Sequence, residues 1–101
     1  KDISFYNDSA ATNPDATLAA LKSFKERLHL ILGGSDKGLD YINLAEYISK
    51  SKNIKTVALV GQLQNKLYKI LKPRPGLEIK RFKALKEVVR LLINSLETLL
   101  H

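Results

Sequence analysis

The sequence predicts an all-α protein, an antiparallel four-helix bundle with a flexible N-terminal arm. Apolar residues recur with the spacing of a helix face in four segments of the chain. Connections of a few residues, rich in Gly, Pro or Asn, separate these segments, and short connections make consecutive helices antiparallel neighbours. No segment stands out as alternating between apolar and polar residues. We therefore expect an arm or linker at residues 1–12 and one helical domain at residues 13–101.

The first half of the chain is expected to hold the arm and two helices. Asn13-Pro14-Asp15 predicts a helix start. Asn caps free N–H groups, Pro suits the first helical position, and Asp faces the positive end of the helix dipole. This helix is expected to run to about residue 32, where Gly33 and Gly34 end it. A second helix is expected from residue 39 to residue 51.

The second half of the chain is expected to hold two longer helices. The third covers residues 54–72; its segment 57–60 is β-prone, but the flanks keep the helical period. The Pro-rich segment 73–76 stops this helix. The fourth helix covers residues 77–100, and its apolar arc of roughly 200° is wider than the single stripe of a surface helix. Such a helix needs at least two neighbours or a partner chain.

A basic pole is the strongest charge feature of the sequence. Between residues 66 and 86 the chain has eight basic residues and one acid, and this excess equals the net charge of +7 of the whole chain. In an antiparallel hairpin these charges converge around residues 73–76 and crowd the positive end of the fourth helix dipole. That arrangement favours a negatively charged partner, although a solvated lysine-rich end explains it too. The basic pole consists of Lys66, Lys69, Lys72, Arg74, Lys80, Arg81, Lys83 and Lys86.

The fourth helix also provides a candidate apolar partner face. Its side chains either form ordinary core or lie open for the helix of a partner. The residues of this face are Leu91, Ile93, Leu99 and Leu100.

The sequence offers little support for catalysis or for metal binding. It contains no Cys, which excludes disulfides, thiol chemistry and thiolate zinc sites. His29 has Glu26 one turn before it, and such a pair on a helix face is usually a surface pair. The glycine segments match neither a phosphate-binding loop nor a dinucleotide fingerprint. We expect no catalytic residue, no metal and no cofactor, and therefore no enzyme.

The predicted function is a non-enzymatic interaction module that binds a partner protein through the apolar face and is steered by the basic pole. The partner is expected to carry an acidic or amphipathic helical surface. The alternative is a nucleic-acid-binding domain that contacts phosphates through the same pole. A helix-turn-helix is disfavoured by Lys50 and Lys55, which stand where small or apolar residues are usual.

The remaining expectations concern the setting of the protein. No apolar run is long enough for a membrane span, and a peripheral membrane contact is disfavoured because the basic residues face away from the apolar arc. The compartment stays open, with a cytoplasmic or nuclear location favoured slightly. Because the sequence starts with Lys1, we expect a domain cut or processed from a longer protein.

Overall fold

The computed structural model describes the fold of residues 3–100, and all side chains in that range except those of residues 3, 92 and 95–100. Within this range the chain alternates between four strands and four helices. In chain order they are β1 (Ile3–Asp8), α1 (Pro14–Leu21), β2 (Arg27–Leu32), α2 (Ile42–Lys50), β3 (Ile54–Leu59), α3 (Gln64–Ile70), β4 (Glu78–Arg81) and α4 (Leu85–Leu100).

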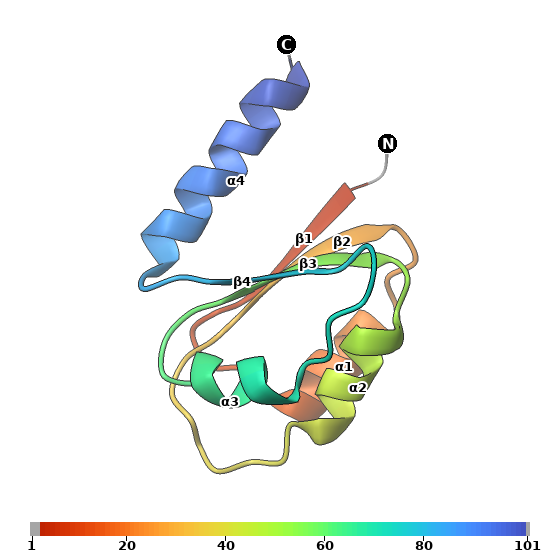
Figure 1. The fold of residues 1–101 in the computed structure, drawn as a ribbon, viewed down its shortest axis with the longest axis vertical. Helices are drawn as coiled ribbons and strands as arrows, with labels where there is room; N and C mark the ends of the chain where they lie inside the picture. The colour runs from red at the N-terminus through yellow and green to blue at the C-terminus, as the bar shows by residue number, and fades with distance from the viewer. Residues whose placement is uncertain (1–2, 101) are drawn as a thin grey trace.

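The strands form one parallel sheet in the order β1-β2-β3-β4. Right-handed crossovers that all advance in one direction place their helices on the same face of a sheet. Figure 1 shows this arrangement, with α1, α2 and α3 on one side of the sheet and α4 on the other. Because all strands point the same way, the loops that follow them gather at one edge of the sheet, the carboxyl edge. The loops that precede β2, β3 and β4 gather at the opposite, amino edge.

The main core lies between the sheet and α1, α2 and α3. Leu30 of β2 and Leu59 of β3 face it and are almost completely buried, as is Leu67 of α3. The opposite face of the sheet has a smaller buried cluster, in which Val88 of α4 packs with residues that include Ile31 of β2. Since α4 has no other buried residue among those described, it covers this face only in part. None of the described helices is long and apolar enough to cross a lipid bilayer.

The structure contradicts the predicted all-α bundle and its flexible arm. The expected arm contributes β1, which pairs with β2 along its whole length. The expected first and third helices each divide into two elements, α1 with β2 and β3 with α3. The segment expected as the fourth helix begins with β4, and only its later part, α4, is helical. The architecture is therefore α/β.

The all-α prediction failed because the sequence pattern of a buried parallel strand resembles that of a helix. A strand covered on both faces is a continuous apolar run, not an alternating one, so it resembles one face of a helix. Residues 28–32 and 57–60 are such runs, and all nine residues except His29 are buried. The β-prone character of residues 57–60 was the correct signal. The helix start at Asn13 is confirmed, because its side-chain oxygen accepts a hydrogen bond from the N–H of Ala16 at 3.1 Å.

Candidate functional site

The carboxyl edge is the candidate site because ligands of open parallel sheets bind where the strands end. Four loops meet the edge, at residues 9–13, 33–41, 60–63 and 82–84. A hollow of about 280 Å³ opens beside the first two loops, between the starts of α1 and α2. Its lining residues are Asn13, Pro14, Asp15, Leu39, Asp40 and Asn43.

Backbone contacts hold the first three loops together. Gly34 has φ +97°, and a Cβ atom there would lie 2.6 Å from the carbonyl oxygen of Ala10. On the other side of Gly34, a Cβ atom on Gly61 would lie 3.0 Å from the Gly34 nitrogen. The N–H of Leu63 donates to the Gly34 carbonyl at 2.9 Å. Only glycine permits this close approach, so the pair Gly33-Gly34 serves a loop after a strand and does not end a helix.

Thr12 ties the loop after β1 to the loop after β2. Its hydroxyl donates to the carbonyl of Asp8 at 2.8 Å and accepts from the N–H of Gly33 at 2.9 Å. Its own N–H donates to the Gly33 carbonyl at 3.1 Å. The Thr17 hydroxyl donates to the carboxylate of Asp8. Thr12 and Thr17 are both buried, so these bonds fix the end of β1 rigidly.

The tip of the loop after β2 is organised by Asp36. One oxygen of its carboxylate accepts from the N–H of Gly38 and from the ammonium group of Lys66, each at 2.9 Å. The N–H of Asp36 donates to the side-chain oxygen of Gln62 at 3.1 Å. The Gly38 hydrogen bond, followed by the bond from Lys66, lowers the pKa of Asp36 below its ordinary value. Asp36 is therefore ionised at neutral pH.

Lys37 stands at this tip, between Asp36 and Gly38. It is exposed, and it forms no ion pair with any described side chain. A lysine ammonium group donates up to three hydrogen bonds and suits a carboxylate or a phosphate. Lys37 is not among the candidate residues predicted from the sequence. The signal that could have found it is a glycine-rich segment with a lysine directly after an apolar run, which indicates a strand followed by an anion-binding loop.

A second cation, Arg81, lies at the carboxyl end of β4 but is already engaged. It donates to the side-chain oxygen of Gln64 at 3.0 Å and to that of Asn65, and its guanidinium carbon lies 4.9 Å from the centre of the Tyr68 ring. The side-chain amide of Gln64 donates in turn to the carbonyl of Phe82 at 3.0 Å. These contacts fix the end of β4 against α3.

The hairpin that was expected to gather the basic pole does not exist. Lys66 and Arg81 lie at the carboxyl edge, whereas Lys72 and Arg74 lie in the connection that leads into the amino edge. Lys80 pairs with Glu78 at 3.9 Å. Lys69, Lys83 and Lys86 are exposed on α3, in the loop after β4 and on α4. The structure thus divides the pole between two ends of the sheet, and a role in partner contact stays a prediction.

The predicted apolar partner face lies on α4. Leu91 and Ile93 are 38% and 51% exposed, so they are not part of the core. The side chains of Leu99 and Leu100 lie outside the described residues. A role of this face in partner contact also stays a prediction.

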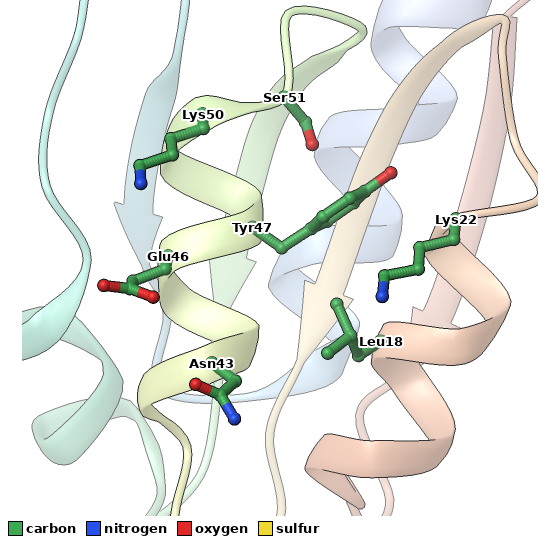
Figure 2. Close-up of a pocket in the computed structure, with 7 residues that line it drawn as sticks. All are labelled: Leu18, Lys22, Asn43, Glu46, Tyr47, Lys50 and Ser51. Carbon is green, nitrogen blue, oxygen red and sulfur yellow. The ribbon is translucent and has the colours of Figure 1, made fainter.

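A larger hollow, of about 510 Å³, lies elsewhere, between α1 and α2. Figure 2 shows Tyr47 reaching from α2 toward α1 above Leu18, with Lys22 on one side and Lys50 on the other. Glu46 also lines the hollow but points away from Lys22, so the charged groups of the hollow do not converge on one point. The hollow does not include the loops of the carboxyl edge. Among the described residues, no group of His, Cys, Asp or Glu side chains could hold a metal ion.

Comparison with known proteins reveals the family. Residues 1–98 match the family model described as "Mur ligase, glutamate ligase domain". A UDP-N-acetylmuramoylalanine–D-glutamate ligase from Koribacter versatilis is 41% identical over 91 residues, which are 90% of this chain and 19% of that protein. The ligases of the same name from Acetivibrio thermocellus and Fervidobacterium nodosum are 38% and 42% identical, over 87% and 84% of the chain and 20% of each relative. No solved structure matches the chain significantly.

These similarities correct the predicted function. The expected non-enzymatic interaction module and the alternative nucleic-acid-binding domain are both wrong, because the similar proteins are ligases and therefore enzymes. The prediction failed because it rested on a charge cluster in a hairpin that the fold does not contain. The chain spans only 19–20% of the length of these three relatives. The match over residues 1–98 shows that the chain belongs to the Mur ligase family, as its glutamate ligase domain.

Proposed function

We propose that this chain is the D-glutamate-binding part of a UDP-N-acetylmuramoylalanine–D-glutamate ligase. The proposal is supported by the family and by relatives that carry that name. Because the chain spans about a fifth of those relatives, the rest of the ligation machinery would be supplied by other parts of a longer enzyme. The single observation that carries the proposal is the ordered, glycine-rich loop that presents Lys37 at the carboxyl edge.

The chemistry of D-glutamate fits this edge. The amino acid carries two carboxylates and one ammonium group at neutral pH, so its binding site needs at least one cation. Lys37 provides an exposed cation without an ion-pair partner among the described residues, while Lys66 is paired and Arg81 is engaged by α3. In the proposed reaction Lys37 holds one carboxylate, and this contact orients the amino group toward the acyl group that it attacks. The chain thereby binds and orients the amino acid.

The test is the binding of D-glutamate to the complete gene product that carries this domain. Lys37→Met is expected to weaken binding by about tenfold to a hundredfold, which is the loss expected for a charge-assisted hydrogen bond. Lys69→Met, a substitution at an exposed lysine of α3, is the matched control and is expected to leave the dissociation constant unchanged. Isothermal titration calorimetry measures the constant, and mass spectrometry of the ligated product measures activity. Equal affinity of the Lys37→Met variant and the parent protein would overturn the site.

We also propose that the enzyme acts in the cytoplasm, where a ligase working on a nucleotide-linked precursor meets its substrates. A nuclear location is not supported, since the similar proteins are bacterial ligases. Cell fractionation with detection of the gene product tests the location, and recovery in another fraction would contradict it.

A further inference from the structure

We propose that Asp36 and Lys66 are positioning residues, which hold the loop of Lys37 in the conformation that receives the substrate carboxylate. The inference rests on the proposed function. It concerns residues that act through Lys37 and do not themselves touch the substrate. Three observations carry it: the hydrogen bonds on both sides of Lys37, the anchoring of Lys66, and the charge that the ion pair removes from the site.

The first observation is that one carboxylate fixes both neighbours of Lys37. The Asp36 side chain accepts from the N–H of Gly38, so a hydrogen-bonded turn closes around Lys37. The N–H of Asp36 is held by Gln62 from the loop after β3. The tip of the loop is therefore attached through Asp36 to the loop after β3, and Lys37 lies in a fixed turn.

The second observation is that Lys66 is itself anchored. It lies on α3 and is only half-exposed, and its ammonium nitrogen sits 5.4 Å from the centre of the Tyr41 ring, within the range of a cation–π contact. Tyr41 is 1% exposed and belongs to the main core. The chain of contacts from the core through Tyr41 and Lys66 to Asp36 gives the loop a rigid support.

The third observation concerns charge and order. Asp36 neutralises Lys66, so Lys37 is left as the cation of this loop without an ion pair among described residues. Gly38, at φ +71°, directly follows Lys37, and glycine gives a loop more conformational freedom than any other residue. Without the bonds of Asp36, the substrate would have to order this segment on binding, and ordering weakens affinity.

The experiment compares D-glutamate dissociation constants for variants of the complete gene product by calorimetry. Asp36→Ala removes both hydrogen bonds to the carboxylate, and we expect about tenfold weaker binding, the order of magnitude for losing the backbone order of one residue. Asp36→Asn keeps an oxygen that can accept from Gly38, whereas Lys66→Met removes the ion pair with Asp36 and the cation–π contact with Tyr41. Asp36→Asn is expected to weaken binding less than about threefold, and Lys66→Met about threefold, the order of one partly exposed ion pair. Unchanged binding of Lys66→Met would overturn the positioning role of Lys66.

A double-mutant cycle separates positioning from direct contact. In a Lys37→Met background, Asp36→Ala is expected to have no further effect on affinity, because nothing remains for Asp36 to position. An equal loss in both backgrounds would overturn the inference, as would unchanged binding of Asp36→Ala in the parent protein. If Lys37→Met alone leaves binding unchanged, the proposed function of the site fails first, and the two failures are thereby distinguished.

Two controls exclude a general effect on folding. Tyr41→Phe keeps the ring under Lys66 and removes a buried hydroxyl that has no hydrogen-bond partner among the described residues. We expect D-glutamate affinity to be unchanged in this variant. Thermal melting of each variant reports the fold. A melting temperature of Asp36→Ala equal to that of the parent, together with weaker binding, would support positioning, whereas a melting loss that accounts for the weaker binding would contradict it.

Discussion

The carboxyl and amino edges of the sheet are held together in different ways. At the carboxyl edge the loops pack backbone against backbone around Gly34, side chains such as Thr12 and Asp36 tie them together, and Lys37 is left exposed. At the amino edge long side chains do the joining. Arg74 donates to the carbonyls of Ser49 at 2.7 Å and Ile54 at 2.9 Å, and to that of Ser51.

Asn53 adds a second link at the amino edge, since its side-chain amide donates to the carbonyls of Phe24 at 3.2 Å and Glu26 at 3.1 Å. The difference between the edges shows how the domain separates stability from ligand binding. Polar side chains used for stability cannot also meet a ligand. Lys37 takes no part in the contacts that hold the carboxyl edge together, and it is therefore available for binding.

The largest expected effect comes from adding a methyl group at the carboxyl edge. Gly34→Ala combines the strain of a left-handed conformation, roughly 1–2 kcal/mol, with a clash against the Ala10 carbonyl, about 1–3 kcal/mol. We expect a loss of about 2–5 kcal/mol in the free energy of unfolding, measured by urea denaturation. Gly38→Ala is the matched control, because a Cβ atom there meets nothing within 4 Å. Equal losses in the two variants would contradict close packing at Gly34.

A smaller effect is expected from removing the central side chain of the amino edge. Arg74→Met removes the four hydrogen bonds that the side chain donates to backbone carbonyls, three of which join the amino edge, and we expect about 2 kcal/mol less stability. D-glutamate affinity should not change, because the carboxyl edge is intact. Lys72→Met, at an exposed neighbour, should alter neither quantity. If the Arg74→Met variant is fully folded and still binds D-glutamate more weakly, the two edges are not independent.

The smallest expected effect is a dependence of stability on pH, caused by His29 on the partly covered face of the sheet. Burial, followed by the charge of Arg27, lowers the pKa of His29, which stacks on Phe5 with ring centres 5.2 Å apart. The unfolded state therefore binds the proton more readily than the folded state. The free energy of unfolding should be highest above about pH 6.5, where His29 is neutral in both states, and should fall as the pH is lowered. Urea denaturation at several pH values measures the fall, which His29→Leu should remove.

The contribution of the carboxyl edge to stability should be lost only at lower pH. The pKa of Asp36 is also lowered, so its contribution to stability is present above its unfolded pKa, about 3.8, and is lost as the pH falls further. Between about pH 6.5 and 4.5 the decline in the free energy of unfolding should therefore come from His29 and not from Asp36. A decline that persists in full in His29→Leu would assign it to another group.

The sequence alone determined the local features, because these depend on residues close together in the chain. The cap at Asn13 and the start of α1 at Pro14 were predicted correctly. The predicted helix at residues 39–51 contains α2, and the Pro-rich segment 73–76 does follow the end of α3. Each of these signals acts within one turn of backbone, where capping and proline geometry apply whatever the fold.

Only the tertiary structure decided which apolar runs are strands and which residues meet at the site. Residues 28–32 and 57–59 are strands because neighbouring strands satisfy their backbone groups, while helices cover one face of the sheet and part of the other, and neither condition is visible in a single segment. Asp36 and Lys66 are 30 residues apart in sequence and 2.9 Å apart in space. Their contact depends on the parallel order of β2 and β3, which brings the loops after both strands to one edge. A contact between residues so far apart in sequence follows from the sheet and cannot be predicted from local sequence patterns.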